Sequence, residues 1–322
     1  MEQGARIYVA GHAGLAGSAI VRALARAGHS NLVLRTHAEL ELTDARAVQA
    51  FFDRERPAYV FLAAAKVGGI LANDTYPADF IQSNLEVELN VIRTAWNSGV
   101  RRLLFLGSSC IYPRDCAQPM KEEYLLTGPL EPTNRAYAIA KIAGIELCWS
   151  YNRQHGARFL AAMPTNLYGP GDSYDLQNSH VLPALIRKIH DAKRHGAHEV
   201  TLWGSGRPRR EFLLSDDMAE ACVFLMRLPA AGFDRLVAPG KAPLINIGAG
   251  EDQSIAELAV LVADVLGYKG KFVYDASKPD GTPRKLLDSS RIMALGWKPT
   301  TTLRQGIALA HQDFLLRHAA AA

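Results

Sequence analysis

The chain has 322 residues, of which 48% are hydrophobic and 21% are charged, as in a folded protein with one large or two interlocking domains. Its formal net charge of +4 is spread along the sequence, which suits an anionic small molecule better than a nucleic acid. Without an apolar run of ~20 residues or paired cysteine motifs, we expect a soluble, cytoplasmic protein with no membrane segment and no metal.

The first predicted strand, residues 6–10, leads into a glycine-rich loop with the spacing G-x-x-G-x-x-G, and a helix is predicted from the loop to about Ala27. Glycine permits the tight turn and lets backbone N–H groups approach a pyrophosphate at the helix start. The same spacing also occurs in turns that bind nothing. We predict that the loop binds a dinucleotide through Gly11, His12, Ala13, Gly14, Leu15, Ala16 and Gly17.

The second predicted strand, residues 31–34, ends at Arg35. NAD sites usually have an acidic residue about 20 positions after the glycine loop, where it binds the ribose 2′-hydroxyl. Here Arg35 takes that neighbourhood, and a cation favours a 2′-phosphate. We therefore predict NADP(H), with possible help from His37; the alternative is that Arg35 is a solvated strand end.

Strands and helices continue to alternate up to residue 106. We predict helices over residues 44–55 and 77–98, with Thr43 or Asp44 capping the first, and strands over 59–63 and 103–106. This alternation predicts an α/β fold with a doubly wound parallel sheet, as in a Rossmann domain. Small residues after the 59–63 strand, including Ala64, would let a cofactor approach the backbone.

The richest chemistry follows the 103–106 strand, at the strand end where open α/β sheets usually bind ligands. Tyr137 and Lys141, four residues apart on a helix predicted to run to about residue 155, share one face. A neighbouring ammonium favours the phenolate and makes the tyrosine a usable acid near neutral pH. We expect Ser108, Tyr137 and Lys141 to reduce a ketone. The alternative is an ordinary helix with a surface tyrosine and lysine.

A further strand, residues 159–163, ends in Pro164, Thr165, Asn166, Leu167, Tyr168, Gly169 and Pro170. With the glycine loop, Ser108 and Tyr137-x-x-x-Lys141, this turn resembles the extended short-chain dehydrogenase/reductases. Within that family the chain is most similar to the 3,5-epimerase/4-reductases of GDP-4-keto-6-deoxy-mannose. The shared stretches are residues 63–70, 106–113, 138–144, Asn178-Ser179-His180 and 278–288.

The resemblance implies two inversions followed by a reduction. Cys110 would be the base and His180 the acid that exchange protons at C3 and C5 of the sugar. Ser108 and Tyr137 would polarise the C4 ketone, and Tyr137 would protonate its oxygen as NADPH delivers hydride. Lys141 would hold the nicotinamide ribose and lower the pKa of the tyrosine. Taken singly, an inert buried cysteine and a solvated histidine are the alternatives.

The resemblance also implies the binding residues. Beyond the glycine loop, the cofactor would contact Arg35, Ala64, Leu106, Gly107, Ser108, Ser109, Tyr137, Lys141, Pro164, Thr165, Asn166, Leu167 and His180. The GDP-sugar would contact Asn166, Lys188, Trp203, Arg210, Asp280 and Lys285. Trp203 could stack on guanine or a sugar, and Arg210 could bind the diphosphate. The family commonly has arginines at the positions of Ala13 and His37, so some use of NAD(H) is also expected.

After residue 170 the strict alternation ends. We predict helices over 181–193, 216–228, 254–266 and 303–317, strands over 200–203, 244–247 and 272–274, and a loop over 229–241. Asp216 and Asp217 are expected to cap the second of these helices. The predicted NADP-binding domain spans residues 1–165, with a return near 215–248, and residues 166–322 form mainly the substrate domain. A homodimer is expected from the resemblance.

Two other functions are compatible with parts of the pattern. One is a different nucleotide-sugar 4-epimerase, 4-reductase or 4,6-dehydratase; dehydratases usually have Asp-Glu where this chain has Ser109-Cys110. The other is a non-catalytic NADP-binding sensor. Such sensors commonly lose the tyrosine or lysine that this chain keeps, so an enzyme is the favoured interpretation.

Overall fold

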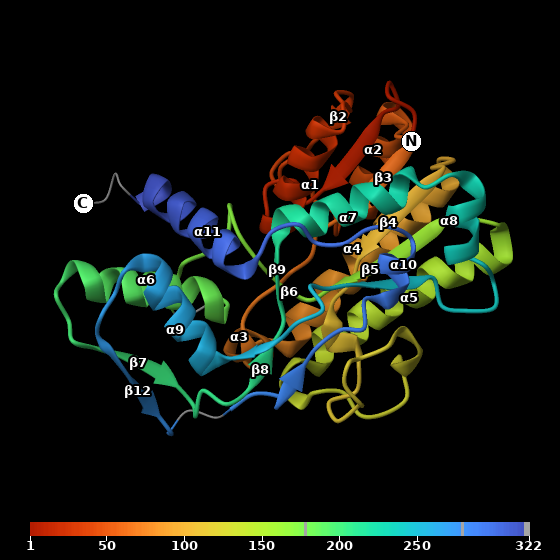
Figure 1. Cartoon of the computed structure of the whole chain (residues 1–322). Coiled ribbons are helices and arrows are strands. Elements are labelled where there is room, and N and C mark those ends of the chain that lie inside the picture. The colour runs from red at the N-terminus through yellow and green to blue at the C-terminus, as the bar shows by residue number, and fades with distance from the viewer. Residues whose placement is uncertain (177–178, 278–279, 319–322) are drawn as a thin grey trace.

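The computed structural model describes residues 1–176, 179–277 and 280–318. Six strands of this described part form a parallel sheet in the order β10-β5-β4-β3-β1-β2 (Figure 1). They are β1 (Ile7–Ala10), β2 (Leu32–Val33), β3 (Tyr59–Leu62), β4 (Arg102–Leu106), β5 (Phe159–Pro164) and β10 (Leu244–Ile247). The predicted doubly wound parallel sheet is confirmed.

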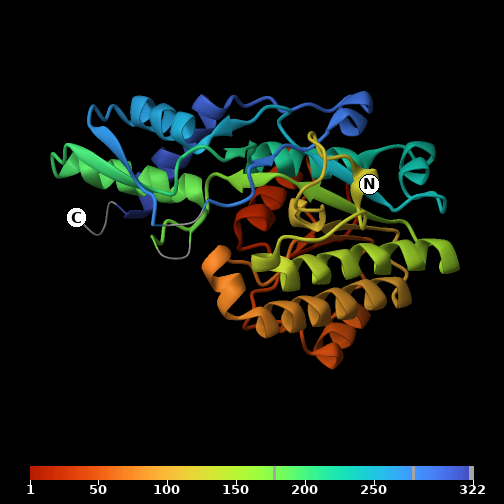
Figure 2. The ribbon, with the colours of Figure 1, turned by 90° about the horizontal axis from the view of Figure 1, so that it is seen from below.

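Helices cover both faces of this sheet because its strands are apolar on both sides. In β1, for example, Tyr8 packs with α2 (Ala45–Glu55), α4 (Pro77–Asn97) and α5 (Arg135–His155), whereas Val9 packs with α1 (Leu15–Arg26) and α7 (Ser215–Arg227). Figure 2 shows α4 and α5 lying side by side along one face. Successive side chains of each strand point to opposite faces of the sheet and so pack into two separate cores.

The order in which the chain adds strands to the sheet reverses at β1. From β1 the chain moves to β2 on one side, and after α2 it crosses to β3 on the other. Ligands bind open α/β sheets at such a switch point, beyond the carboxyl ends of the strands. The glycine loop after β1 and the small residues after β3 meet there: a Cβ on Gly11 would lie 2.7 Å from the backbone nitrogen of Ala64.

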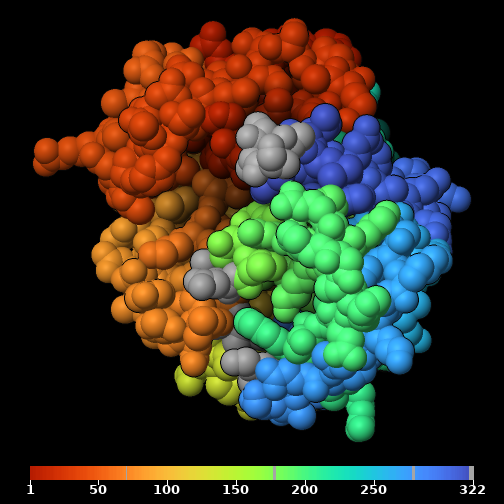
Figure 3. All heavy atoms as spheres, turned by 90° about the vertical axis from the view of Figure 1, so that its left-hand side faces the viewer, coloured from red at the N-terminus to blue at the C-terminus, as the bar shows by residue number. Residues whose placement is uncertain are grey.

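A third core joins the elements of the second half (Figure 1). Its helices are α6 (Val181–Arg194), α9 (Ile255–Leu266) and α11 (Leu303–His318). Its small sheets pair β7 (Glu199–Trp203) with β12 (Lys271–Asp275), β6 (Asn166–Tyr168) with β9 (Phe212–Leu214), and β8 (Arg209–Arg210) with β11 (Gln253–Ser254) and β13 (Arg284–Lys285). Figure 3 shows this half facing the N-terminal half across a hollow. None of the described helices combines the length and apolarity needed to cross a bilayer.

Two predictions about α7 and the segment after it were wrong. Residues 229–241 contain a helix, α8 (Ala230–Leu236), held by the buried ring of Phe233, which packs under the guanidinium of Arg102 at 4.3 Å. Asp216 and Asp217 do not cap α7, because the helix already begins at Ser215. Asp216 instead binds Arg22 of α1, with 2.6 Å between carboxylate oxygen and guanidinium nitrogen.

The other predicted helices and strands are found within a few residues of their expected ends, and Asp44 is the N-cap of α2. The structure adds short elements that the sequence pattern did not indicate. They are α3 (Ile70–Thr75), α10 (Ser290–Ala294), η1 (Ser109–Ile111), η2 (Glu122–Tyr124), η3 (Pro132–Asn134) and the short strands β6, β8, β9, β11 and β13.

Candidate active site

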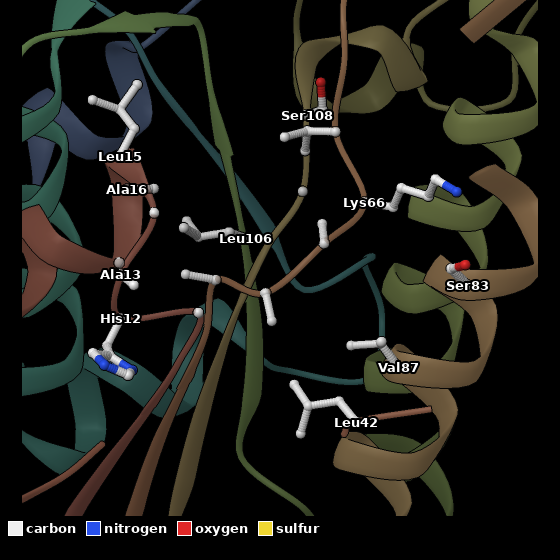
Figure 4. Close-up of a pocket in the computed structure, with 18 of the residues that line it drawn as sticks. His12, Ala13, Leu15, Ala16, Leu42, Lys66, Ser83, Val87, Leu106 and Ser108 are labelled. Atoms are coloured by element: carbon white, nitrogen blue, oxygen red, sulfur yellow. The ribbon is translucent and has the colours of Figure 1, made fainter. Parts of the chain in front are cut away.

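A cavity of about 860 Å³ opens at the carboxyl ends of β1, β3, β4 and β5. Every residue predicted to bind the cofactor lines it, from the glycine loop to His180. In Figure 4 the labelled residues of the glycine loop form one wall and Leu42, Lys66, Ser83 and Val87 the other. Cavities of this size hold small-molecule ligands and cofactors.

The glycine loop has the features of a pyrophosphate cradle. Gly11 has φ +79°, and a Cβ on Gly17 would overlap the carbonyl of Gly11, so both positions need glycine for the tight turn. In the described structure Gly14, the N-cap of α1, makes no side-chain cap, which leaves the first-turn N–H groups for an anion. Within the same described part, the buried Nδ1 of His12 has no hydrogen-bond partner. The loop therefore fits a bound dinucleotide.

The cations expected at the 2′-phosphate are already paired. Arg35 lines the cavity, but its Nη2 lies 2.6 Å from Oε1 of Glu55, and its guanidinium lies over the ring of Phe51 at 5.7 Å. His37 Nε2 lies 2.8 Å from a carboxylate oxygen of Glu41. A 2′-phosphate at this end of the cavity must therefore share Arg35 with a carboxylate.

Ser108, Cys110 and Tyr137 form one group at the end of β4. The backbone N–H of Cys110 donates to Oγ of Ser108 at 3.4 Å, and Ser108 is close enough to Tyr137 to act on the pKa of its hydroxyl, in the lowering direction. Burial raises the pKa of Tyr137 well above its usual value, with further raising by Cys110 and Glu88. The net direction is thus opposite to the lowering predicted from Lys141, because burial has the largest effect on this pKa.

Lys141 is almost completely enclosed. Its Nζ donates to the carbonyl of Leu106 at 3.1 Å and lies 3.2 Å from Oε1 of Glu88. The same nitrogen lies 4.6 Å from the ring centroid of Phe105 and 5.7 Å from that of Tyr137. The predicted pairing of lysine and tyrosine on one helix face is confirmed, and a carboxylate from α4 joins it.

Burial is also the main cause of the pKa shifts of Cys110 and His180, the predicted base and acid of the epimerisation. Cys110 is 6% exposed, and burial raises the pKa of its thiol; Ser108, Lys285 and Lys141 act in the opposite direction. The expected lowering is therefore not met, although the expected cations are close. His180 begins α6 at the cavity, and desolvation lowers the pKa of its imidazole.

Of the residues predicted to bind substrate, Asn166 lines the cavity, whereas the others lie outside the lining that the structure describes. Lys188 Nζ lies 5.0 Å above the ring of Trp203, which is 58% exposed. Arg210 donates to the carbonyl of Thr282 at 2.6 Å, and Asp280 accepts from the backbone N–H of Ser205 at 2.8 Å.

Three residues of the stretches that carry the resemblance, Asn178, Lys278 and Pro279, lie outside the described residues. Burial is the main cause of the lowered pKa of Lys285. Cys110 and Arg210 are close enough to act on this pKa as well, Cys110 raising it and Arg210 lowering it. Lys285 thus stands between the predicted diphosphate site and the predicted base.

Sequence reasoning missed Glu88, which was treated as part of an ordinary helix. The available signal was a carboxylate on the buried face of α4, one turn from Asn84 and flanked by Val87 and Val91. A charge at such a position needs a buried partner. Other cavity residues that were not predicted to contact the cofactor include Leu42, Thr43, Ser83 and Val87.

A doubly wound sheet with a glycine loop at its switch point and a Ser-Tyr-Lys group beside it defines a nicotinamide-dependent epimerase or reductase. Residues 7–248 match the NAD dependent epimerase/dehydratase family, and the chain belongs to that family.

Named relatives narrow the class. The chain is 55% identical over 310 residues to the GDP-L-fucose synthase of Escherichia coli K12, covering 96% of each protein. It is 55% identical over 314 residues to GDP-L-fucose synthase 1 of Arabidopsis thaliana, covering 98% of this chain and 94% of that protein. Among solved structures, a GDP-mannoheptose C4 reductase from Campylobacter jejuni with NADP bound matches with a TM-score of 0.89 at 40% identity, over 98% and 99% of the two chains. An NADP-bound GDP-L-fucose synthetase from Naegleria fowleri matches with a TM-score of 0.86 at 27% identity, over 100% and 97%.

Proposed function

We propose that this chain is a GDP-L-fucose synthase. It epimerises GDP-4-keto-6-deoxy-D-mannose at C3 and C5 and reduces its C4 ketone, with NADP(H) as cofactor. The observation that carries this proposal is the group of Ser108, Cys110 and Tyr137, where the cysteine adds a second acid–base group to a reductase site. The 55% identity with named GDP-L-fucose synthases along nearly the whole chain supports the same activity.

Different residues of the cavity would bind different parts of the cofactor. The glycine loop would hold the pyrophosphate, Arg35 the 2′-phosphate, and Lys141 the nicotinamide ribose. When bound, NADPH supplies a hydride. The end of β4, with Leu106, Gly107 and Ser108, lines the cavity where the nicotinamide and the ketone would meet.

Epimerisation comes first because the ketone makes the neighbouring C–H groups acidic. The Cys110 thiolate would take a proton from C3, and later from C5, leaving an enolate whose oxygen accepts hydrogen bonds from Ser108 and Tyr137. His180 would return a proton to the opposite face of each carbon and regain one from solvent, while the Cys110 thiol would release its proton to solvent before the next abstraction. One proton leaves and one arrives at each centre, so only the configuration changes.

Reduction then consumes the ketone. The Tyr137 hydroxyl would give its proton to the C4 oxygen as that carbon accepts the hydride that NADPH supplies, which would form the alcohol and leave a phenolate. The raised pKa of Tyr137 keeps this hydroxyl protonated at neutral pH. Solvent then returns the proton to the phenolate.

The GDP end of the substrate would lie toward β8, β13 and α6. Arg210 and Lys285 offer positive charge to the diphosphate, and the half-exposed Trp203 with Lys188 offers a stacking surface. Asp280 would accept ribose or sugar hydroxyls, with Ser205 already fixing its carboxylate.

A second candidate is a GDP-sugar C4 reductase that does not invert C3 and C5. The likeness to the C4 reductase from Campylobacter jejuni favours it as the runner-up. Cys110 distinguishes the two functions, because a simple reductase has no need of a second base.

The deciding experiment incubates the protein with GDP-4-keto-6-deoxy-D-mannose and NADPH, and follows absorbance at ~340 nm, where the reduced nicotinamide absorbs. GDP-L-fucose is the expected product, and a 4-reduced sugar with unchanged C3 and C5 would favour the runner-up. Cys110→Ser should still bind the ketone but lose uptake of solvent deuterium at C3 and C5. No oxidation with either NADPH or NADH would defeat the enzyme assignment.

We also retain the proposed division of the chain. Residues 1–165, with the return near 215–248, would bind NADP(H), and residues 166–322 would bind mainly the GDP-sugar. Support comes from the third core, which is built from residues after 166. A cytoplasmic location is a proposal that rests on the sequence composition, and a homodimer is a proposal that rests on the family resemblance.

A further inference from the structure

A buried carboxylate stands directly behind the catalytic lysine. The side chain of Glu88 on α4 is 1% exposed, and that of Lys141 is 2% exposed. Their charged atoms, Oε1 and Nζ, are 3.2 Å apart. Among the described residues, neither carboxylate oxygen of Glu88 has a hydrogen-bond partner, so the ion pair with Lys141 is what compensates its buried charge. A buried carboxylate is costly unless paired, so its presence here needs a reason.

The surroundings fix the ammonium of Lys141 in one place. The carbonyl of Leu106 accepts a hydrogen bond from one of its N–H groups at 3.1 Å. The carboxylate of Glu88 lies on another side of the nitrogen and pairs with a second N–H group. The rings of Phe105 and Tyr137 lie at 4.6 and 5.7 Å. Because an ammonium has three N–H groups, the third remains for the cavity that Lys141 lines.

The fold makes room for this carboxylate. Gly144 lies on α5, one turn beyond Lys141 and against α4, and a Cβ there would lie 2.8 Å from Oε2 of Glu88 and 2.5 Å from the ring of Phe105. Any side chain at residue 144 would push Glu88 or the ring away. The glycine thus lets α4 approach closely enough for its carboxylate to reach the lysine.

We propose that Glu88 is a positioning residue for the reduction step: its carboxylate holds the Lys141 ammonium beside Tyr137 and leaves one of its N–H groups directed at the cavity. The proposal rests on the proposed reduction of a keto-sugar. It adds a residue that touches neither substrate nor cofactor and acts through Lys141.

The charges near Glu88 support this role. Its negative charge raises the pKa of Tyr137, and burial raises its own pKa to about 7 against the opposing effect of Lys141. Lys141, Tyr137 and Cys148, all on α5, are the titratable groups that interact with it in the described structure. From β4, the Phe105 ring shares the space beside Gly144 with it, and the Leu106 carbonyl is linked to it through Lys141; neither group titrates. The carboxylate is therefore mostly charged above about pH 7 and mostly neutral below that pH.

The test compares Glu88→Gln with Glu88→Asp and with Glu86→Gln. Glu86 is a matched control because it lies on the same helix and accepts from Gln82 at the exposed surface. The rate of NADPH oxidation at saturating GDP-4-keto-6-deoxy-D-mannose is measured from pH 6 to 10, with thermal unfolding as the check of folding.

For Glu88→Gln we expect kcat at pH 7.5 to fall about tenfold or more, whereas the KM for GDP-4-keto-6-deoxy-D-mannose should change less than about twofold. Because Glu88 loses its charge below about pH 7, the wild-type rate should fall in an acid limb near that pH, and Glu88→Gln should shift this limb out of the measured range. Glu88→Asp keeps the charge and should keep the limb near its wild-type position. A folded Glu88→Gln variant with the wild-type profile, or an aspartate variant whose limb shifts like that of glutamine, would overturn the proposal. Failure of the wild-type protein to oxidise NADPH would instead remove the reduction step itself.

Discussion

At the scale of single residues, the reactivity of Cys110 depends on a balance between burial and nearby cations. Burial raises the pKa of the thiol, and among the charged groups Lys285 opposes the rise most strongly. Proton abstraction needs the thiolate, so exchange at C3 and C5 should rise with pH. Lys285→Met removes the opposing charge, and at pH 7.5 we expect exchange of the bound substrate to fall about tenfold, equivalent to one pKa unit.

This prediction is checked by solvent-deuterium uptake in a single turnover at saturating substrate, which separates chemistry from weaker binding. Lys121→Met serves as the control, because Lys121 is exposed. If Lys285→Met shows the wild-type pH dependence of exchange, Lys285 does not tune the cysteine.

The pairing of Arg35 gives a second residue-scale prediction. Glu55 holds the guanidinium at 2.6 Å, so a 2′-phosphate must compete with a carboxylate. Glu55→Gln removes that competition, and we expect the preference for NADPH over NADH, measured as the ratio of kcat/KM values, to increase about three- to tenfold. Half-buried ion pairs have effects of this order. Asp53→Asn, on the same helix, should leave the ratio unchanged; a lower ratio in Glu55→Gln would mean that Glu55 instead orients Arg35 for the phosphate.

At the scale of elements, the turn between β1 and α1 depends on Gly17. A Cβ there would overlap the backbone of Gly11, which cannot move as a flexible side chain could. Gly17→Ala should therefore destabilise the protein by about 2–3 kcal/mol in urea unfolding. Gly14→Ala is the matched control, because its Cβ would meet the Gly11 carbonyl at an ordinary 3.5 Å and φ is −81°. That change should cost less than about 1 kcal/mol, and equal losses in both variants would refute this account of the turn.

The sequence predicted the alternating elements well because their signals are local. Apolar runs and glycine stops set the ends of β1, α1 and α5, and Asp44 caps α2 as expected. Helix α8 was missed because it is short and packs through Phe233 against Arg102, a contact between distant parts of the chain. Tertiary contacts override local signals in such segments.

The same distinction holds for the site. The glycine loop and the Tyr137–Lys141 pair could be predicted, since spacing alone places their side chains together. The raised pKa of Cys110 and the ion pair of Glu88 could not, because they depend on burial and on how closely α4 approaches α5. Spacing predicts which groups meet, whereas packing decides their protonation.

At the scale of the whole molecule, residues 169–174 link the two halves. Tyr174 donates to the carbonyl of Ala310 on α11 at 2.7 Å, and a Cβ on Gly171 would lie 3.4 Å from Oγ of Ser18 on α1. Asp172 is buried within this link. Its Oδ1 accepts from Ser173, whereas Oδ2 is buried without a hydrogen-bond partner among the described residues. A carboxylate held in this way makes the stability of the fold depend on pH.

Burial raises the pKa of Asp172 to about 6, against opposing contributions from Ser173 and Arg317. Since the folded-state pKa exceeds the unfolded one, the protonated group stabilises the fold most at low pH, and this stabilisation is lost as pH rises through about 6. Between pH 5 and 8 the loss is about 1.5 kcal/mol. Asp172→Asn cannot titrate, so its free energy of unfolding relative to wild type should improve by about that amount from pH 5 to pH 8 in urea titrations. Asp191→Asn, an exposed change on α6, should show no such trend, and a constant difference for Asp172→Asn across this range would mean that the carboxylate is not destabilised by burial.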